Sequence, residues 1–223
     1  YNVTMLVKSF SEKINTTLGR LSPARRIFLS FALVILLGSL LLSLPFVQET
    51  SSQATYFDHL FTAVSMVCVT GLFTQSVAST YNIWGQLICM VLIQIGGLGL
   101  MTFLGIFYIQ GKQKLSLRGR ETILESFSFE ETQSLKDFLR SIFVTTFLVE
   151  GFGAFLLSFR FVPDFGLGRG IFTSIFVAVS AFCNAGFDNF GSTRLTDFQT
   201  DPLINLVIAG LIITGGLGFM VWF

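Results

Sequence analysis

Residues 61–71 read Phe61-Thr62-Ala63-Val64-Ser65-Met66-Val67-Cys68-Val69-Thr70-Gly71, and a similar stretch returns at residues 176–186. Six positions are identical and lie 115 residues apart: Phe61/Phe176, Ala63/Ala178, Val64/Val179, Ser65/Ser180, Cys68/Cys183 and Gly71/Gly186. A second block, Gly96-Gly97-Leu98-Gly99 with Met101, recurs 119 positions later as Gly215-Gly216-Leu217-Gly218 with Met220. We infer an internal duplication. Such repeats are typical of transporters and pores, because duplicated bundles share a surface near the bilayer midplane.

The composition predicts a membrane protein. Apolar residues make up 52% of the chain, charged residues only 12%, and 27 residues are Phe, which would leave a soluble domain with too much exposed apolar surface. A net charge of +1 gives no reason to expect a nucleic acid partner. The three cysteines, Cys68, Cys89 and Cys183, all lie in apolar stretches, so we expect reduced thiols that serve as small packing residues.

The first copy contains three apolar segments. Residues 27–44 are long enough to cross a hydrocarbon core of about 30 Å. Residues 56–69 would reach only about 21 Å as a helix and therefore enter and return. Residues 84–109 are long enough to span again. One unit is thus a span, a short helix with a loop, and a second span.

The second copy repeats this order, with a span at residues 141–159, a short helix at 170–183 and the start of a span at 203–223. The predicted fold is an all-α membrane protein of two parallel tandem repeats, each helix, pore helix with loop, helix, and the second repeat is clipped. We expect a cytoplasmic segment at 1–26, a first repeat at 27–110, a cytoplasmic loop at 111–140 and a second repeat at 141–223. Because the chain begins with Tyr1 and ends inside an apolar run, we expect a fragment.

The placement of charged residues indicates which ends of the predicted spans face the cytoplasm. Five Lys or Arg precede the first span and six lie in residues 111–140, whereas the opposite-side segments hold only Arg160, Arg169 and Arg194. The positive-inside rule then places the N-terminus in the cytoplasm. The opposite side has a net charge of −3, which would concentrate cations; its acidic residues are Glu49, Asp58, Asp164, Asp188, Asp197 and Asp201.

Each short helix is followed by a glycine-containing loop, Val69-Thr70-Gly71-Leu72 in the first copy and Asn184-Ala185-Gly186-Phe187 in the second. Non-helical backbone at membrane depth is tolerated only where it is buried or lines water. Its carbonyl oxygens can replace the hydration shell of a monovalent cation. Gly71 and Gly186 are alternatively turn glycines with a packing role only, but their identical placement in two copies favours the filter.

Glu150 and the two glycine clusters can each be interpreted in two ways. Glu150 is the only acidic residue within a predicted span. It either faces the ion path or pairs with another part of the complete protein, as a functional intramembrane group, or is a structural carboxylate hydrogen-bonded between helices, which we favour. The glycine clusters at 96–99 and 215–218 either let a helix bend or permit close packing.

The chain resembles the superfamily of potassium transporters that includes the bacterial Ktr and Trk membrane subunits, and it is most similar to the Ktr branch. The motifs that carry the resemblance are Asp58, Leu60-Phe61-Thr62-Ala63, Val69-Thr70-Gly71-Leu72, Gln94-Ile95-Gly96-Gly97-Leu98-Gly99 and Phe182-Cys183-Asn184-Ala185-Gly186-Phe187. The resemblance implies four units around one potassium pathway, with Gly71 and Gly186 as the first and second filter glycines. Potassium would be bound by backbone carbonyls, with sodium as a coupling ion and no organic cofactor in this chain.

The sequence also differs from the pattern of this superfamily. The third and fourth filter loops, and the gate that the family places in its third unit, are not in this sequence. Cys68 stands where Thr is common in the family, which is either a tolerated exchange or a change in the hydrogen bonding of the loop.

The loop at 111–140 mixes basic and acidic side chains with apolar ones. It is either an ordinary solvated loop or a docking surface, and the resemblance favours docking of a cytosolic nucleotide-binding regulatory ring of the KtrA or TrkA type. Membrane lipid and a homodimer of the full-length subunit are the other implied partners, in the bacterial inner membrane.

These observations predict a pore-forming subunit of an uptake system for monovalent cations, and most specifically for potassium. We expect a cytosolic subunit to gate it. The alternative is a non-conducting membrane scaffold whose re-entrant loops only pack. An intramembrane enzyme is disfavoured, because no nucleophile and base occur at usable spacing.

Overall fold

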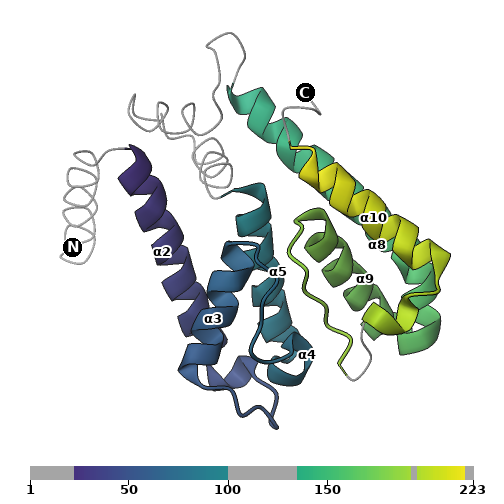
Figure 1. Cartoon of the computed structure of the whole chain (residues 1–223), viewed down its shortest axis with the longest axis horizontal. Helices are drawn as coiled ribbons and strands as arrows, with labels where there is room; N and C mark the ends of the chain where they lie inside the picture. Colours follow the sequence, from purple (N-terminus) through teal and green to yellow (C-terminus); the bar gives the residue numbers. More distant parts are fainter. Residues whose placement is uncertain (1–22, 100–134, 192–194, 219–223) are drawn as a thin grey trace, which may run out of the picture.

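The computed structural model describes residues 23–99, 135–191 and 195–218, and over these residues the fold is helical (Figure 1). Short 3-10 helices lie at Pro45–Val47 and Leu195–Phe198. The α-helices are α2 (Pro23–Leu42), α3 (Tyr56–Val67), α4 (Val77–Thr80), α5 (Ile83–Leu98), α8 (Leu135–Phe165), α9 (Leu167–Phe182) and α10 (Pro202–Gly216).

The helices form two similar groups. In Figure 1, α2 and α8 run down the page, and the helices that follow each of them, α3 and α5 or α9 and α10, run up it. The short helices α3 and α9 both end about halfway up the bundle, and the chain then returns downward before the next helix. Each group of the described chain contains a helix, a short helix followed by a non-helical segment, and a further helix.

The last helix of each group begins in the same way. The side chain of Asn82 accepts hydrogen bonds from the backbone N–H groups of Trp84 and Gly85 at the start of α5. Asp201, 119 positions after Asn82, accepts from the N–H groups two and three residues further on at the start of α10. Asn and Asp are favoured at this position because the side chain satisfies otherwise unpaired donors.

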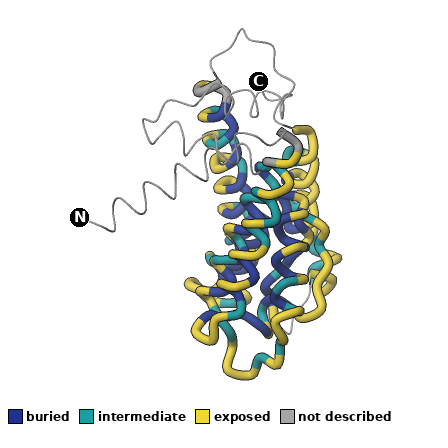
Figure 2. The backbone as a smooth tube through the Cα atoms, turned by 90° about the vertical axis from the view of Figure 1, so that its left-hand side faces the viewer, coloured by how far each residue is buried: buried dark blue, intermediate teal, exposed yellow. Residues whose placement is uncertain are grey.

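Close packing within each group also repeats. A Cβ atom on Gly38 of α2 would lie 2.7 Å from the Leu92 side chain of α5, and a Cβ atom on Gly153 of α8 would lie 2.7 Å from the Leu211 side chain of α10. Glycine at these positions lets a leucine side chain lie directly against the neighbouring backbone. Figure 2 shows buried residues along the inner sides of the helices and exposed residues along their outer sides.

Helix α8 is longer than the predicted span at 141–159. It begins at Leu135, so the last residues of the predicted loop at 111–140 are helical, and it contains Arg160 and Asp164, which we had expected outside the span. The reason is an aromatic cluster: Phe161 and Phe165 pack against Phe190, with ring centroids 5.2 and 5.9 Å apart, and against Phe198. Burial of these large side chains stabilises the last turns of the helix.

Helix α5 is shorter than the predicted span at 84–109. It ends at Leu98, and Gly99 adopts a positive φ of 77°; residues 100–109 of the predicted span lie outside the described residues. A positive φ is readily available to glycine but not to residues with a Cβ atom. Gly218 has the same conformation, with φ of 79°, just after α10.

Among the described helices, Leu139–Phe165 within α8 is the one that is long and apolar enough to cross a membrane, and α2, α5, α9 and α10 contain shorter apolar helices. Several predictions lie outside the described residues. They concern most of the N-terminal segment at 1–26, most of the loop at 111–140, Arg194, and the residues Met101 and Met220 of the second repeated block.

Candidate cation-filter loops

The first candidate loop follows α3 directly. Its backbone hydrogen bonds are Cys68 N–H to the carbonyl of Val64, at 2.8 Å, and Thr70 N–H to the carbonyl of Ser65, at 2.9 Å. Positive φ angles occur at Val69 (55°) and Gly71 (71°). A positive φ at a β-branched residue such as Val69 is uncommon, which shows how firmly the surrounding structure holds this loop.

The second candidate loop has the same backbone geometry 115 positions later. Cys183 N–H donates to the carbonyl of Val179 at 2.9 Å, and Ala185 N–H donates to the carbonyl of Ser180 at 2.8 Å. The positive φ angles fall at Asn184 (57°) and Gly186 (71°). The two loop sequences differ at three of their four positions, yet the positive φ angles fall at equivalent residues.

A serine hydroxyl holds each loop from inside. The Ser65 hydroxyl accepts a hydrogen bond from the N–H of Leu72 at 2.9 Å, and the Ser180 hydroxyl accepts from the N–H of Phe187 at 2.8 Å. Both serines are buried. We assigned no role to them from sequence, although their recurrence at the same separation as the glycines was the available signal.

These bonds use the N–H groups of the loops and leave the carbonyl groups free. Within the described residues, the carbonyl oxygens of Val69, Thr70 and Gly71 accept no hydrogen bond, and the same holds for those of Asn184, Ala185 and Gly186. Unpaired carbonyl oxygens are the ligands that replace water around a monovalent cation in a filter. In the described structure these carbonyl oxygens are therefore available as ligands.

The two loops meet each other. A Cβ atom on Gly71 would lie 2.9 Å from the carbonyl oxygen of Ala185, and a Cβ atom on Gly186 would lie 3.5 Å from the Cα atom of Gly71. A side chain at Gly71 would therefore have to displace backbone of the other loop. The structure brings together the two glycines that the sequence singled out.

The glycine clusters lie against the ends of the short helices. A Cβ atom on Gly96 would lie 2.5 Å from the carbonyl oxygen of Val67, and one on Gly215 would overlap the carbonyl of Phe182. Gly97 packs in the same way against Cys183. Close packing therefore accounts for Gly96, Gly97 and Gly215, whereas Gly99 and Gly218, just after the helices, have a positive φ.

Glu150 is buried in the middle of α8, and its partner is Gln94 of α5. The Gln94 side-chain amide donates to Glu150 Oε1 at 2.9 Å. The Cys183 sulfur lies 4.0 Å from both Glu150 Oε1 and Gln94 Oε1. A hydrogen bond between helices matches the structural interpretation of this carboxyl group, and the bond is made within this chain.

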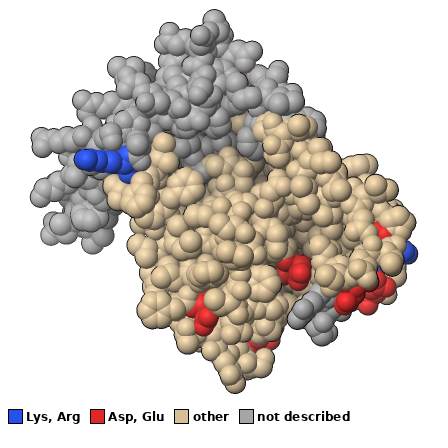
Figure 3. Space-filling model, viewed as in Figure 1, with Lys and Arg blue, Asp and Glu red and all other residues tan. Residues whose placement is uncertain are grey.

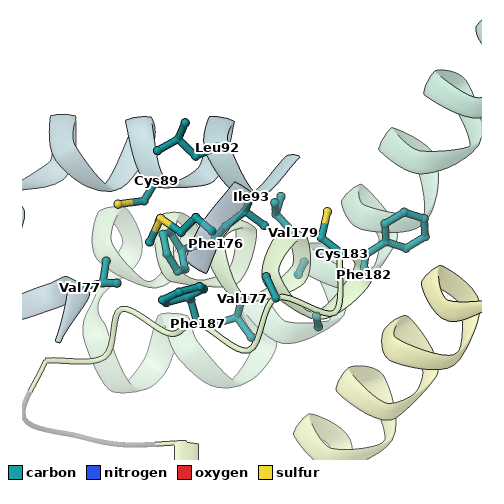
Figure 4. Packing of buried hydrophobic residues seen from close by; sticks show 14 of the residues in the cluster. Val77, Cys89, Leu92, Ile93, Phe176, Val177, Val179, Phe182, Cys183 and Phe187 are labelled. Carbon is teal, nitrogen blue, oxygen red and sulfur yellow. The ribbon is translucent and has the colours of Figure 1, made fainter. Parts of the chain in front are cut away.

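The prediction that all three cysteines are packing residues is wrong for Cys68, which is exposed, whereas Cys89 and Cys183 are buried. The difference follows from the neighbours, because Gly97 of α5 packs directly on Cys183, whereas Cys68 is left exposed within the described structure. Figure 4 shows side chains of α5, among them Cys89 and Ile93, packed with Phe176 of α9.

The carboxylates gather at the lower end of the molecule in Figure 3. Asp58, in the first turn of α3, accepts hydrogen bonds from the Thr74 hydroxyl (2.7 Å) and from the N–H and hydroxyl of Thr55 (2.8 and 2.7 Å). These bonds, that of Thr74 foremost, lower the pKa of Asp58 to about 2, because they favour the charged form. Asp58 is thus ionised at neutral pH.

Asp201 differs from Asp58 because it has a cationic partner. Arg160 Nε donates to Asp201 Oδ2 at 2.6 Å, and the two side chains form an ion pair. The predicted net negative charge of this side is therefore partly compensated within the structure. A cavity of about 180 Å³ lies above this end beside the second loop, and its lining includes Asn184, Gly186 and Ile212.

A comparison with protein families matches residues 25–223 to TrkH, described as a cation transport protein. The potassium/sodium uptake protein NtpJ of Enterococcus hirae is 43% identical over 203 residues, which are 91% of this chain and 45% of that protein. The Ktr system potassium uptake protein B of Bacillus subtilis is 37% identical over 204 residues, covering 92% and 45%. The Ktr system potassium uptake protein B of Vibrio alginolyticus is 38% identical over 197 residues, covering 88% and 43%. The chain thus spans less than half the length of these curated relatives.

Proposed function

Because this chain belongs to the TrkH family of cation transport proteins, we propose that it forms part of the pore-forming membrane subunit of a potassium uptake system. The family is one of transporters and not of enzymes. Potassium passes the loops Val69–Leu72 and Asn184–Phe187 and is bound by their backbone carbonyl oxygens. We propose sodium as the coupling ion, since one relative is named a potassium/sodium uptake protein.

The observation that carries this proposal is the shared geometry of the two loops. Both have positive φ at the same two positions, both are held by a serine hydroxyl, and both keep their carbonyl oxygens free within the described structure. Each loop also follows the C-terminus of a helix, where the partial negative charge of the helix dipole favours a cation. A packing role alone does not require unpaired carbonyl groups in both copies.

In the proposal the two halves are parallel repeats, and further units complete a ring. The support is a difference in exposure between equivalent residues of α5 and α10. Ile93 and Gln94 of α5 are 0% and 8% exposed, because the second group covers them. Their equivalents on α10, Ile212 and Ile213, are 42% and 62% exposed.

The complementary surface is free on the first group. Phe176 of α9 is buried in the joint with α5, and Phe187 of its loop is buried too, whereas the equivalents Phe61 and Leu72 are 41% and 61% exposed. The two groups therefore share one interface between α5 and α9. The surface of α10 that is equivalent to α5, and the surface of α3 that is equivalent to α9, are both left exposed. Head-to-tail contacts of this kind close into a ring when the rotation allows it, and the greater length of the relatives provides sequence for two further units.

In this arrangement the ions pass where four loops face one another. Gly71 and Gly186 lie side by side in the present chain, and the two further loops complete the path. The repeats correspond to residues 27–110 and 141–223. Flux is driven by the membrane potential, since a charge that crosses 100 mV gains about 2.3 kcal/mol.

The proposed orientation places residues 1–26 and 111–140 in the cytoplasm of a bacterial cell, with the protein in the inner membrane. It is supported by the common starting end of α2 and α8 and by the carboxylates at the opposite end (Figures 1 and 3). The loop at 111–140 is the proposed contact with a cytosolic nucleotide-binding ring that gates the pathway. The full-length subunit is proposed to be a homodimer.

Growth of a potassium-uptake-deficient bacterial strain tests this function. The full-length gene, expressed with a cytosolic ring protein of the Ktr type, is expected to restore growth at low potassium and to support uptake of rubidium as a potassium tracer. A protein that reaches the membrane in normal amounts with its partner and restores neither growth nor uptake would instead be the non-conducting scaffold.

A further inference from the structure

A buried pair of polar side chains joins the first helical group to the second. Gln94 lies on α5 and Glu150 on α8, 56 residues apart in sequence, and both are buried. The amide nitrogen of Gln94 lies 2.9 Å from Glu150 Oε1. Polar groups in apolar surroundings are costly unless paired, so this bond fixes the two helices relative to each other.

The second filter loop begins directly beside this pair. The sulfur of Cys183, the residue that caps the C-terminus of α9, lies 4.0 Å from an oxygen of each partner. On its other side Cys183 packs against the backbone of Gly97, where a Cβ atom would overlap it. The start of the loop is therefore enclosed by α5, Gln94 and Glu150.

The far end of the same loop is also held by α5. The Asn189 side-chain amide donates to Gln86 Oε1 at 2.9 Å, and the Gln86 amide donates to the carbonyl of Tyr81 at 2.9 Å. Both glutamines lie on α5. Two amide side chains of the first group thus fix both ends of the loop of the second group.

This polar joint is not repeated along the chain. The residue 115 positions before Glu150 is Ile35, and the residue 119 positions after Gln94 is Ile213. Cys68, the equivalent of Cys183, is exposed. The pair is therefore a feature of one particular joint and not a general requirement for packing one unit.

We propose that Glu150 is a positioning residue which, through Gln94 and Cys183, sets the place of the second filter loop against α5. The inference rests on the proposed function only in its consequence for ion preference. When either partner is lost, the start of the loop shifts, and the carbonyl oxygens of Asn184 and Ala185 no longer keep the spacing that favours potassium over sodium. Selectivity depends on that spacing and on the field of the carbonyl dipoles.

The test uses the full-length protein in the uptake-deficient strain and compares four single variants and one double variant. Glu150→Leu and Gln94→Leu each remove one partner, Glu150→Gln keeps the size and an acceptor oxygen, and Phe152→Leu changes an exposed position of the same helix. We expect about a tenfold loss of rubidium over sodium preference in the two single leucine variants, because a buried polar partner is left unpaired. Glu150→Gln and Phe152→Leu are expected to keep the preference. The double Glu150→Leu, Gln94→Leu variant is expected to be no worse than either single variant, since both act through one bond.

A second readout does not depend on transport. In a protein with Cys68→Ser and Cys89→Ala, Cys183 is the only one of the three cysteines left, and a membrane-permeant maleimide is expected to label it slowly. Glu150→Leu and Gln94→Leu are expected to accelerate labelling about tenfold, by opening its enclosure. Unchanged labelling together with unchanged ion preference in both leucine variants would overturn the proposal. Faster labelling in a protein that does not transport would support the positioning role and reject the proposed function. Unchanged labelling in a protein that does transport would support the proposed function and reject the positioning role.

Discussion

Gly71 and Gly186, 115 residues apart in sequence, face each other, so that a Cβ atom on Gly186 would lie 3.5 Å from the Cα atom of Gly71. Both have a φ of 71°. The contact is asymmetric, because a Cβ atom on Gly71 would come within 2.9 Å of the carbonyl oxygen of Ala185. We therefore expect substitution of Gly71 to be more disruptive than substitution of Gly186, although both introduce a side chain at a left-handed backbone position.

The serine hydroxyls give a prediction about loop stability. Ser65→Ala and Ser180→Ala each leave a loop N–H group without its acceptor. Each variant is expected to lower the free energy of unfolding by about 1–3 kcal/mol, which is the typical cost of an unpaired buried group. Thermal unfolding of the purified full-length protein measures this change.

The matched control for the serine variants is Ser158→Ala. The Ser158 hydroxyl donates to the carbonyl of Phe155 on the exposed side of α8 and holds no loop. Equal unfolding temperatures for Ser158→Ala, Ser65→Ala and Ser180→Ala would show that the loop hydrogen bonds contribute nothing specific.

Gly215 of α10, which lies against the end of α9, gives a prediction about packing. In Gly215→Ala the new methyl group overlaps the carbonyl of Phe182, which is backbone and cannot rotate away. We expect a destabilisation of at least about 1–3 kcal/mol, typical of overpacking, measured as a lower unfolding temperature.

Gly210→Ala in the same helix is the control, because a Cβ atom there would meet no atom within 4 Å. Alanine is the better helix former by up to about 1 kcal/mol, so Gly210→Ala is expected to be neutral or stabilising. If Gly215→Ala were as stable as Gly210→Ala, α10 would not lie on the end of α9 as described.

Asp58 gives a prediction about pH. Its pKa is lowered from 3.8 to about 2 in the folded protein, so the folded state is stabilised by the ionised carboxylate. This stabilisation is complete above the unfolded pKa and is lost as the pH falls from about 4 towards 2. Asp58→Asn is therefore expected to unfold at a lower temperature than the wild type at pH 7, and the difference is expected to shrink over that interval. A difference that stays constant from pH 7 to pH 2 would mean that the carboxylate charge is not the stabilising feature.

The order of helices was predictable from sequence because it rests on local patterns. Apolar stretches of the sequence mark the helices, and the repeated glycines at positions 71 and 186 lie in non-helical segments that follow α3 and α9. The positions of helix ends were less accessible. Helix α8 extends to Phe165 because Phe161 and Phe165 pack against Phe190, and no local pattern of α8 contains that contact.

Partners of buried polar groups were likewise not predictable from sequence. Glu150 was recognised as unusual from its apolar surroundings, but its bond to Gln94 depends on how α5 and α8 lie together. The exposure of Cys68 and the burial of Cys183 could not be distinguished either, because the two residues have the same local sequence context and differ only in what covers them.

The central claim is that the loops containing Gly71 and Gly186 select the ion, and ion competition in the full-length protein tests it most directly. The measurement is rubidium uptake against increasing sodium for the wild type, Gly71→Ser, Gly186→Ser and Gly166→Ser. Gly166 has a φ of 81° and open space around its Cβ position, so Gly166→Ser introduces the same backbone strain away from the loops. We expect Gly71→Ser and Gly186→Ser to lose preference for rubidium over sodium and Gly166→Ser to keep it; unchanged preference in both loop variants would show that these loops do not select the ion.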